Sequence, residues 1–169
     1  MSKKTEHTQF QNATASTLKA VSGDIHTERE IKFSGSSSFL STKEIRLPQI
    51  LKELDTTQLS RLRGESDKIA LKIKHHDPIV HNKYSPSSDL SSQIFQFAED
   101  SRIESVGSKN LVGIKNNLQN LVEEKFKETI LPVPGGDDKE ALMNALQLVI
   151  REKITGCSSP ANTLSLIHI

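Results

Sequence analysis

Apolar residues recur at the spacing of an α-helix in several stretches of the chain. An amphipathic helix places an apolar residue every three or four positions, so that one face packs against the core. This spacing predicts helices over residues 10–21, 55–76, 89–105, 114–126 and 137–154. The apolar face of the longest helix comprises Leu59, Leu62, Ile69, Ala70 and Ile73. Ser66 interrupts that face. The pattern predicts a mainly α-helical fold of about four to five helices.

Residues typical of helix ends accompany these stretches. Asp55, followed by a glutamine three residues later, is typical of a capping box. Asp77 and Pro78 stop the same helix, because proline lacks the amide hydrogen that a helix interior requires. Asp137 and Glu140 form a further capping pair. These signals favour separate helices joined by short connections.

One segment favours a strand over a helix. Residues 28–34 place Ile31 and Phe33 between polar neighbours, which predicts a short strand or hairpin. Residues 34–38 are glycine and serine, typical of a loop. Residues 47–54 begin Leu-Pro, and the residue before a proline favours an extended conformation, so we expect a connector there.

The length of 169 residues suits about one domain. Apolar residues make up 34% and aromatic residues 4%, so the core must consist of leucine, isoleucine and valine. We expect a disordered lead-in over residues 1–9, a helical domain over residues 10–156 and an irregular tail over residues 157–169.

Net charge, cysteine content and the distribution of apolar residues exclude several kinds of partner and location. Twenty-two basic and twenty-one acidic residues leave a net charge of +1, which gives no overall field toward nucleic acid or an anionic membrane. Cys157 is the single cysteine, so an internal disulfide is excluded. The N-terminus lacks the apolar core of a signal peptide, and no apolar run approaches the roughly 20 residues of a membrane span. We expect a cytoplasmic protein without nucleic-acid or membrane partners.

A cluster of imidazole and carboxyl groups stands out at the end of the longest predicted helix. His76, Asp77 and His81 are candidate metal ligands, and His75 precedes them directly. Neutral imidazole and carboxylate are ligands that zinc, cobalt and nickel accept. Pro78 bends the chain inside this cluster, so a shared helix face cannot be assumed. The alternative interpretation is that these residues cap the helix and hydrogen-bond across the turn.

A second set of charged residues indicates an ion network between two predicted helices. It comprises Arg63, Asp67, Glu99, Arg102 and Glu104. Such a network fixes the register of helices more than it adds stability, because desolvation offsets the attraction. The sequence pairs no nucleophile with a base, and it holds no Gly-x-x-x-x-Gly-Lys-Ser/Thr loop. We therefore expect no catalytic residues and no ATP hydrolysis by this chain alone.

Several motifs follow one another in order along the chain: Arg63-Gly64, Asp67, Ala70-Leu71, His76-Asp77, His81, Pro86, Phe95, Glu99, Arg102, Glu104, Gly107, Gly113, Asn117-Leu118, Arg151-Glu152, Thr155-Gly156 and Pro160. Over about residues 15 to 160, this succession resembles the N-terminal region of the CobT subunit of aerobic cobaltochelatase. The resemblance implies a non-catalytic part in cobalamin biosynthesis. The complex of that family is a ligase that inserts Co²⁺ into a corrin, hydrogenobyrinic acid a,c-diamide, at the expense of ATP-Mg.

The resemblance also implies partners. A CobT-like chain is expected to assemble with an AAA+ subunit that hydrolyses ATP and with a large corrin-binding subunit, and to be oligomeric within that complex. Family members continue through an acidic linker into a von Willebrand A-like domain, whereas this sequence ends at Ile169 without one. The leading expectation is an N-terminal assembly module that binds no cofactor itself. The alternatives are a module that delivers cobalt through His76, Asp77 and His81, and a truncated, non-functional remnant or fragment.

Overall fold

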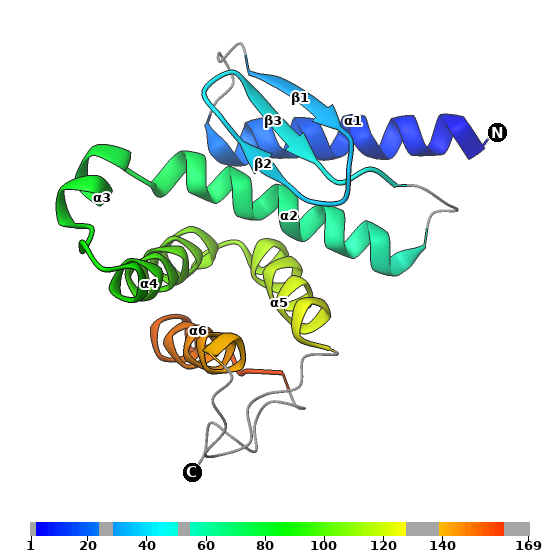
Figure 1. Cartoon of the computed structure of the whole chain (residues 1–169). Helices are drawn as coiled ribbons and strands as arrows, with labels where there is room; N and C mark the ends of the chain where they lie inside the picture. The colour runs from blue at the N-terminus through cyan, green and yellow to red at the C-terminus, as the bar shows by residue number, and fades with distance from the viewer. Residues whose placement is uncertain (1–2, 24–28, 51–54, 128–138, 161–169) are drawn as a thin grey trace. The chain divides into compact units, whose positions relative to one another are not determined.

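The computed structural model of the chain describes residues 3–23, 29–50, 55–127 and 139–160 (Figure 1). Within these ranges the chain forms six helices and a small three-stranded sheet. The prediction of a mainly α-helical fold with a short strand region is therefore confirmed.

The contacts within the chain divide it into two compact units. The first unit consists of Met1–His75 together with Val112–Leu121. The second unit consists of His76–Leu111 together with Val122–Ile169. Each unit therefore combines two separate stretches of sequence. That one helical domain extends over residues 10–156 stays a prediction.

The first unit packs a sheet against two long helices. Its elements are α1 (Lys3–Ser22), β1 (Glu30–Phe33), β2 (Phe39–Leu40), β3 (Glu44–Leu47) and α2 (Thr56–His75). The strand order is β1-β3-β2, with β1 parallel and β2 antiparallel to β3 (Figure 1). Helices α1 and α2 lie against each other, and one core joins them to β3 through Leu18, Ile45, Leu47, Leu62 and Ile69.

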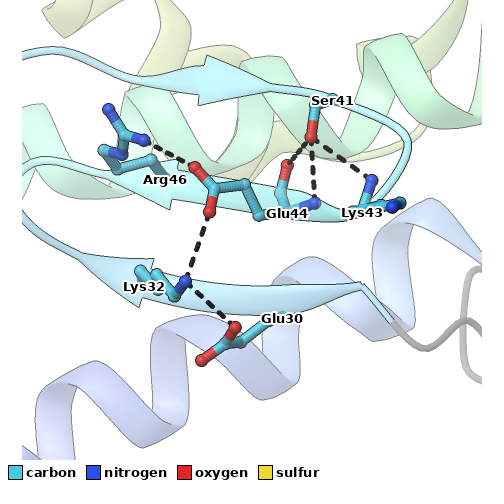
Figure 2. Close-up of polar contacts among 6 residues, drawn as sticks. All are labelled: Glu30, Lys32, Ser41, Lys43, Glu44 and Arg46. Atoms are coloured by element: carbon cyan, nitrogen blue, oxygen red, sulfur yellow. Dashed lines mark hydrogen bonds and ion pairs between the residues drawn. The ribbon is translucent and has the colours of Figure 1, made fainter.

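A polar cluster connects the side chains of β1 and β3 (Figure 2). Glu30 lies opposite Glu44, and Lys32 lies opposite Arg46. Directly opposed like charges repel each other, but here the ion pairs run along and between the strands. Lys32 Nζ lies 3.0 Å from Glu30 and 3.3 Å from Glu44, and Arg46 Nη2 lies 2.6 Å from Glu44 (Figure 2). Ser41 Oγ accepts a 3.0 Å hydrogen bond from the Glu44 amide, which tightens the turn before β3.

The second unit is helical in its described part. Its elements are α3 (Pro78–Tyr84), α4 (Asp89–Ser108), α6 (Lys139–Thr155) and the last turn of α5 (Val112–Phe126). Helix α4 packs along α6. The buried side chains of Phe126 and Leu148 pack together, with Val122 and Ala145 beside them.

Several predicted elements lie where the sequence places them. Strand β1 falls within the predicted strand, and α2 ends just before Asp77 and Pro78. Ser88 caps α4, and its hydroxyl accepts a hydrogen bond from the amide of Ser91. Gly156 adopts a φ of 68° after α6, a conformation that glycine accepts without strain. Residues 157–160 have no regular secondary structure, and residues 161–169 lie outside the described ranges. The irregular tail over residues 157–169 therefore stays a prediction.

Other predictions differ from the structure. Helix α1 begins at Lys3, so residues 3–9 are helical where a disordered lead-in was expected. Ser66 is 2% exposed, so this polar residue lies among the buried side chains of α2, as predicted, and the helix continues through it. Strand β3 was not predicted, because its pairing with β1 is not visible in the local pattern. The capping pair of Asp137 and Glu140 cannot be compared, since Asp137 lies outside the described residues.

Candidate metal centre

The candidate site lies where the chain enters α3. Asp77 caps this helix, and its Oδ1 accepts hydrogen bonds of 2.9 Å from the Ile79 amide and 3.1 Å from the Val80 amide. Pro78 occupies the first turn, where the missing amide hydrogen costs nothing. The His81 amide donates a 2.9 Å hydrogen bond to the Asp77 carbonyl. This capped turn places His76 before the helix and His81 within it.

Helix α4 brings a carboxylate to the two histidines. Glu99 Oε1 lies 2.9 Å from His76 Nδ1. Arg102, one turn further along α4, donates to the same carboxylate, from Nε to Oε2 at 2.7 Å and from Nη2 to Oε1 at 2.9 Å. The side chains of His76 and Glu99 are 15% and 13% exposed, whereas that of Arg102 is 47% exposed. The carboxylate is therefore largely enclosed, whereas the Arg102 side chain that binds it is partly open to solvent.

The imidazole of His81 completes the cluster. Its ring centroid lies 4.9 Å from that of His76 and 4.8 Å from that of Phe95 on α4. Its Nδ1 atom is buried and has no hydrogen-bond partner within the described residues. A buried polar atom without a partner costs about 1–3 kcal/mol, so this arrangement calls for an explanation.

His76, His81 and Glu99 together have the composition of a metal site. Each offers one ligand atom, and these three atoms all lie within 4.8 Å of one another. Two imidazoles and one carboxylate are a set that binds zinc with a fourth position left for water or another ligand. The same donors accept cobalt and nickel.

The charge state of Glu99 suits a ligand. The hydrogen bonds from Arg102 lower the pKa of the Glu99 carboxyl to about 2, against the opposing effect of burial and with a smaller contribution from His76. Glu99 is therefore a carboxylate throughout the neutral range. Its charge is compensated in this structure by the Arg102 guanidinium, and its Oε1 also faces His76 Nδ1.

A comparison with known protein families bears on the identity of the chain. The family described as cobalamin biosynthesis protein CobT matches residues 4–169. The chain belongs to the CobT family. This membership supports a part in cobalamin biosynthesis. No solved structure matches the chain. Among the described helices, none has both the length and the apolar character that crossing a membrane requires.

The group of converging donor atoms in this CobT-family chain differs in one member from the candidate ligands that the sequence suggested. His76 and His81 lie together as expected, but Asp77 is engaged in capping α3 and does not belong to the group of converging ligand atoms. Glu99 takes that place, although the sequence placed it only in an ion network. Glu99 is separated from His76 by 23 positions, so no local spacing could reveal their contact.

The residues of the predicted ion network have partners within their own units. In the first unit, the Arg63 guanidinium lies 5.0 Å from the ring centroid of Phe10, and Asp67 accepts a 2.7 Å hydrogen bond from Asn117. In the second unit, Glu99 binds Arg102. The coupling of Arg63 and Asp67 to Glu99 and Arg102 stays a prediction.

Glu104, the fifth residue of that network, joins α4 to α6. It accepts two hydrogen bonds from Arg151, of 3.0 Å from Nε and 2.6 Å from Nη2. Arg151 is only 5% exposed. Buried pairs of this kind are costly to break, because the remaining charge is left without a partner. We assign Glu104 and Arg151 a structural role in the packing of the second unit.

Proposed function

We propose that the chain is the N-terminal module of a CobT-like cobaltochelatase subunit, which supports ATP-dependent insertion of cobalt into a corrin in the cytoplasm. The observation that carries the proposal is the family match over residues 4–169. In this proposal Co²⁺ and the corrin, hydrogenobyrinic acid a,c-diamide, are the substrates of the complex. The module contributes by assembling with the AAA+ subunit, which hydrolyses ATP, and with the large corrin-binding subunit.

The residues of the chain favour an assembly role over a catalytic one. The sequence holds no phosphate-binding loop of the Gly-x-x-x-x-Gly-Lys-Ser/Thr type, so the energy of ATP must enter through a partner. The charged side chains that the sequence singled out are held by partners inside the chain, as in Glu104 with Arg151. A module of this kind acts by presenting a surface.

Helix α3 supplies such a surface. None of its seven residues, all of them described, is buried. Ile79 is 80% exposed, Val80 51% and Tyr84 63%. Neighbouring exposed apolar side chains favour contact with another protein, because their burial releases water from apolar surface. Aromatic residues contribute strongly at the centre of protein interfaces.

Co-purification with the AAA+ cobaltochelatase subunit tests the proposal. The tagged chain is co-expressed with that subunit, and the affinity of the purified pair is measured by calorimetry. We expect a stable complex, and we expect the double variant Ile79→Ser/Tyr84→Ser to weaken it by about tenfold or more. Leu142→Ser on α6 is the matched control, since Leu142 is 60% exposed and should leave binding unchanged. Absence of any complex with the wild type would contradict the assembly role, and equal weakening by the control would contradict the part given to α3.

A further inference from the structure

We propose that His76, His81 and Glu99 bind one divalent transition-metal ion of the class of Zn²⁺, Co²⁺ and Ni²⁺. The site belongs to the second unit alone and is formed by the entry to α3 and by one turn of α4. It does not depend on the proposed assembly role, because the ligands all come from this chain. The metal and the AAA+ partner can therefore be tested separately.

The distances within the cluster fit such an ion. The three ligand atoms lie within 4.8 Å of one another, and His76 Nδ1 already lies 2.9 Å from Glu99 Oε1. Zinc binds imidazole nitrogen and carboxylate oxygen at about 2.0–2.2 Å, so tetrahedral ligands are about 3.4 Å apart. The two ligand atoms that lie farthest apart must therefore move about 1–2 Å closer together to bind one ion, and side-chain rotation can supply this movement.

His81 gives the strongest indication of a ligand. Its Nδ1 atom is buried and lacks a hydrogen-bond partner within the described residues. Its ring contacts the rings of both His76 and Phe95, which restricts its rotation. A metal ion at the cluster would supply the partner that this nitrogen lacks. An apolar side chain could fill the same space without leaving a buried nitrogen unsatisfied, so packing alone does not explain a histidine at this position.

The supporting residues orient the ligands. Arg102 holds both oxygens of Glu99 by hydrogen bonds, as residues outside the ligand set commonly do for metal-bound carboxylates. Asp77 fixes the start of α3 and thereby the position of His81 one turn on. Two imidazoles select borderline transition metals, whereas Mg²⁺ and Ca²⁺ prefer ligand sets made of oxygen alone.

Calorimetric titration of the whole 169-residue chain with ZnCl₂ and CoCl₂ tests the site. We expect one ion per chain with a dissociation constant on the order of micromolar or below, and much weaker binding of Mg²⁺. His76→Ala, His81→Ala and Glu99→Gln should each weaken binding by about 100-fold or more, which exceeds the 10–100-fold effect of changing a residue that merely supports a ligand. Bound Co²⁺ should also show the intense visible absorption of a four-coordinate ion.

A neighbouring variant serves as the control. His75→Ala removes the adjacent imidazole, which is not part of the group. It should bind the ions like the wild type. Circular dichroism without metal shows which variants fold. Glu99→Gln keeps the shape of the side chain, so it still tests the site if an alanine variant does not fold. Millimolar binding by the wild type, or wild-type affinity in folded Glu99→Gln, would overturn the proposal.

Discussion

The buried carboxyl of Asp67 makes the stability of the first unit depend on pH. The residue is 3% exposed and accepts a hydrogen bond from Asn117. Burial raises the pKa of the Asp67 carboxyl above its ordinary value of 3.8, and the hydrogen bond from Asn117 and the charge of Arg63 offset only part of this rise. A carboxyl with a raised pKa in the folded state stabilises the fold below its ordinary pKa. This contribution is lost as the pH rises through the folded-state pKa.

The variant Asp67→Asn removes that pH dependence. The amide keeps the shape of the carboxyl and an oxygen that can accept from Asn117, but it carries no charge to desolvate. We expect the free energy of unfolding of the variant to rise relative to the wild type as the pH increases from about 3 through the raised pKa, and then to stay constant. Urea unfolding at a series of pH values measures the difference. A difference that does not change with pH would show that Asp67 has an ordinary pKa in the folded protein.

At the same scale, the residues of the proposed metal site show which side-chain contacts can be predicted from a sequence and which cannot. His76 and His81 are five positions apart, with a proline turn between them, so their proximity is a local property. Glu99 reaches them only because α4 folds back along the entry to α3. Asp77 is the nearest carboxylate in sequence, yet the helix start requires it as a cap. Capping competes with metal binding for the same oxygens, and sequence spacing cannot show which of the two prevails.

At the scale of elements, local chemistry was sufficient at the end of α2, where Asp77 and Pro78 stop the helix as the sequence predicts. The short helix α3 that starts at the same two residues was not predicted, and neither was the start of α1 at Lys3. Strand β3 was not predicted either, although Ile45 and Leu47 alternate with polar residues as Ile31 and Phe33 do. The proline after Leu47 favoured a connector, and only the pairing of β3 with β1 distinguishes a strand from an extended linker.

The approach of α2 to α5 in the first unit depends on a glycine. A Cβ atom on Gly64 would lie 2.8 Å from the Asn117 carbonyl oxygen and 2.8 Å from Leu121 Cβ. We expect Gly64→Ala to lower the free energy of unfolding by about 1–3 kcal/mol, because a carbonyl oxygen in a helix cannot move aside easily. Gly113→Ala is the control, since Gly113 lies in α5 with nothing within 4 Å of such a Cβ. That variant should gain about 0.5–1 kcal/mol from helix propensity. Urea unfolding measures both, and equal stabilisation of the two variants would mean that the helices are not in close contact at Gly64.

At the scale of the whole molecule, each of the two units is built from stretches that are separated in sequence. The first unit takes up residues 112–121 after the second has begun at His76, so neither unit is continuous in sequence. Helical periodicity describes each element separately and contains no information on which elements share a core. The chain passes between the units for the last time inside α5, between Leu121 and Val122. We expect a continuous helix at that point to couple the unfolding of the two units.

This link predicts how the molecule unfolds. Proline within a helix removes a hydrogen bond and clashes with the preceding turn, at a cost of about 3 kcal/mol or more. Glu124 is exposed and lies just beyond the passage between the units, so Glu124→Pro breaks α5 there without removing a core side chain. We expect calorimetry to show one transition for the wild type and two for Glu124→Pro. Val112→Pro is the control, because Val112 is 71% exposed and occupies the first position of α5, where proline is tolerated; this variant should keep one transition. Two transitions in the wild type would show instead that α5 does not couple the units, since each would then unfold independently despite an intact helix.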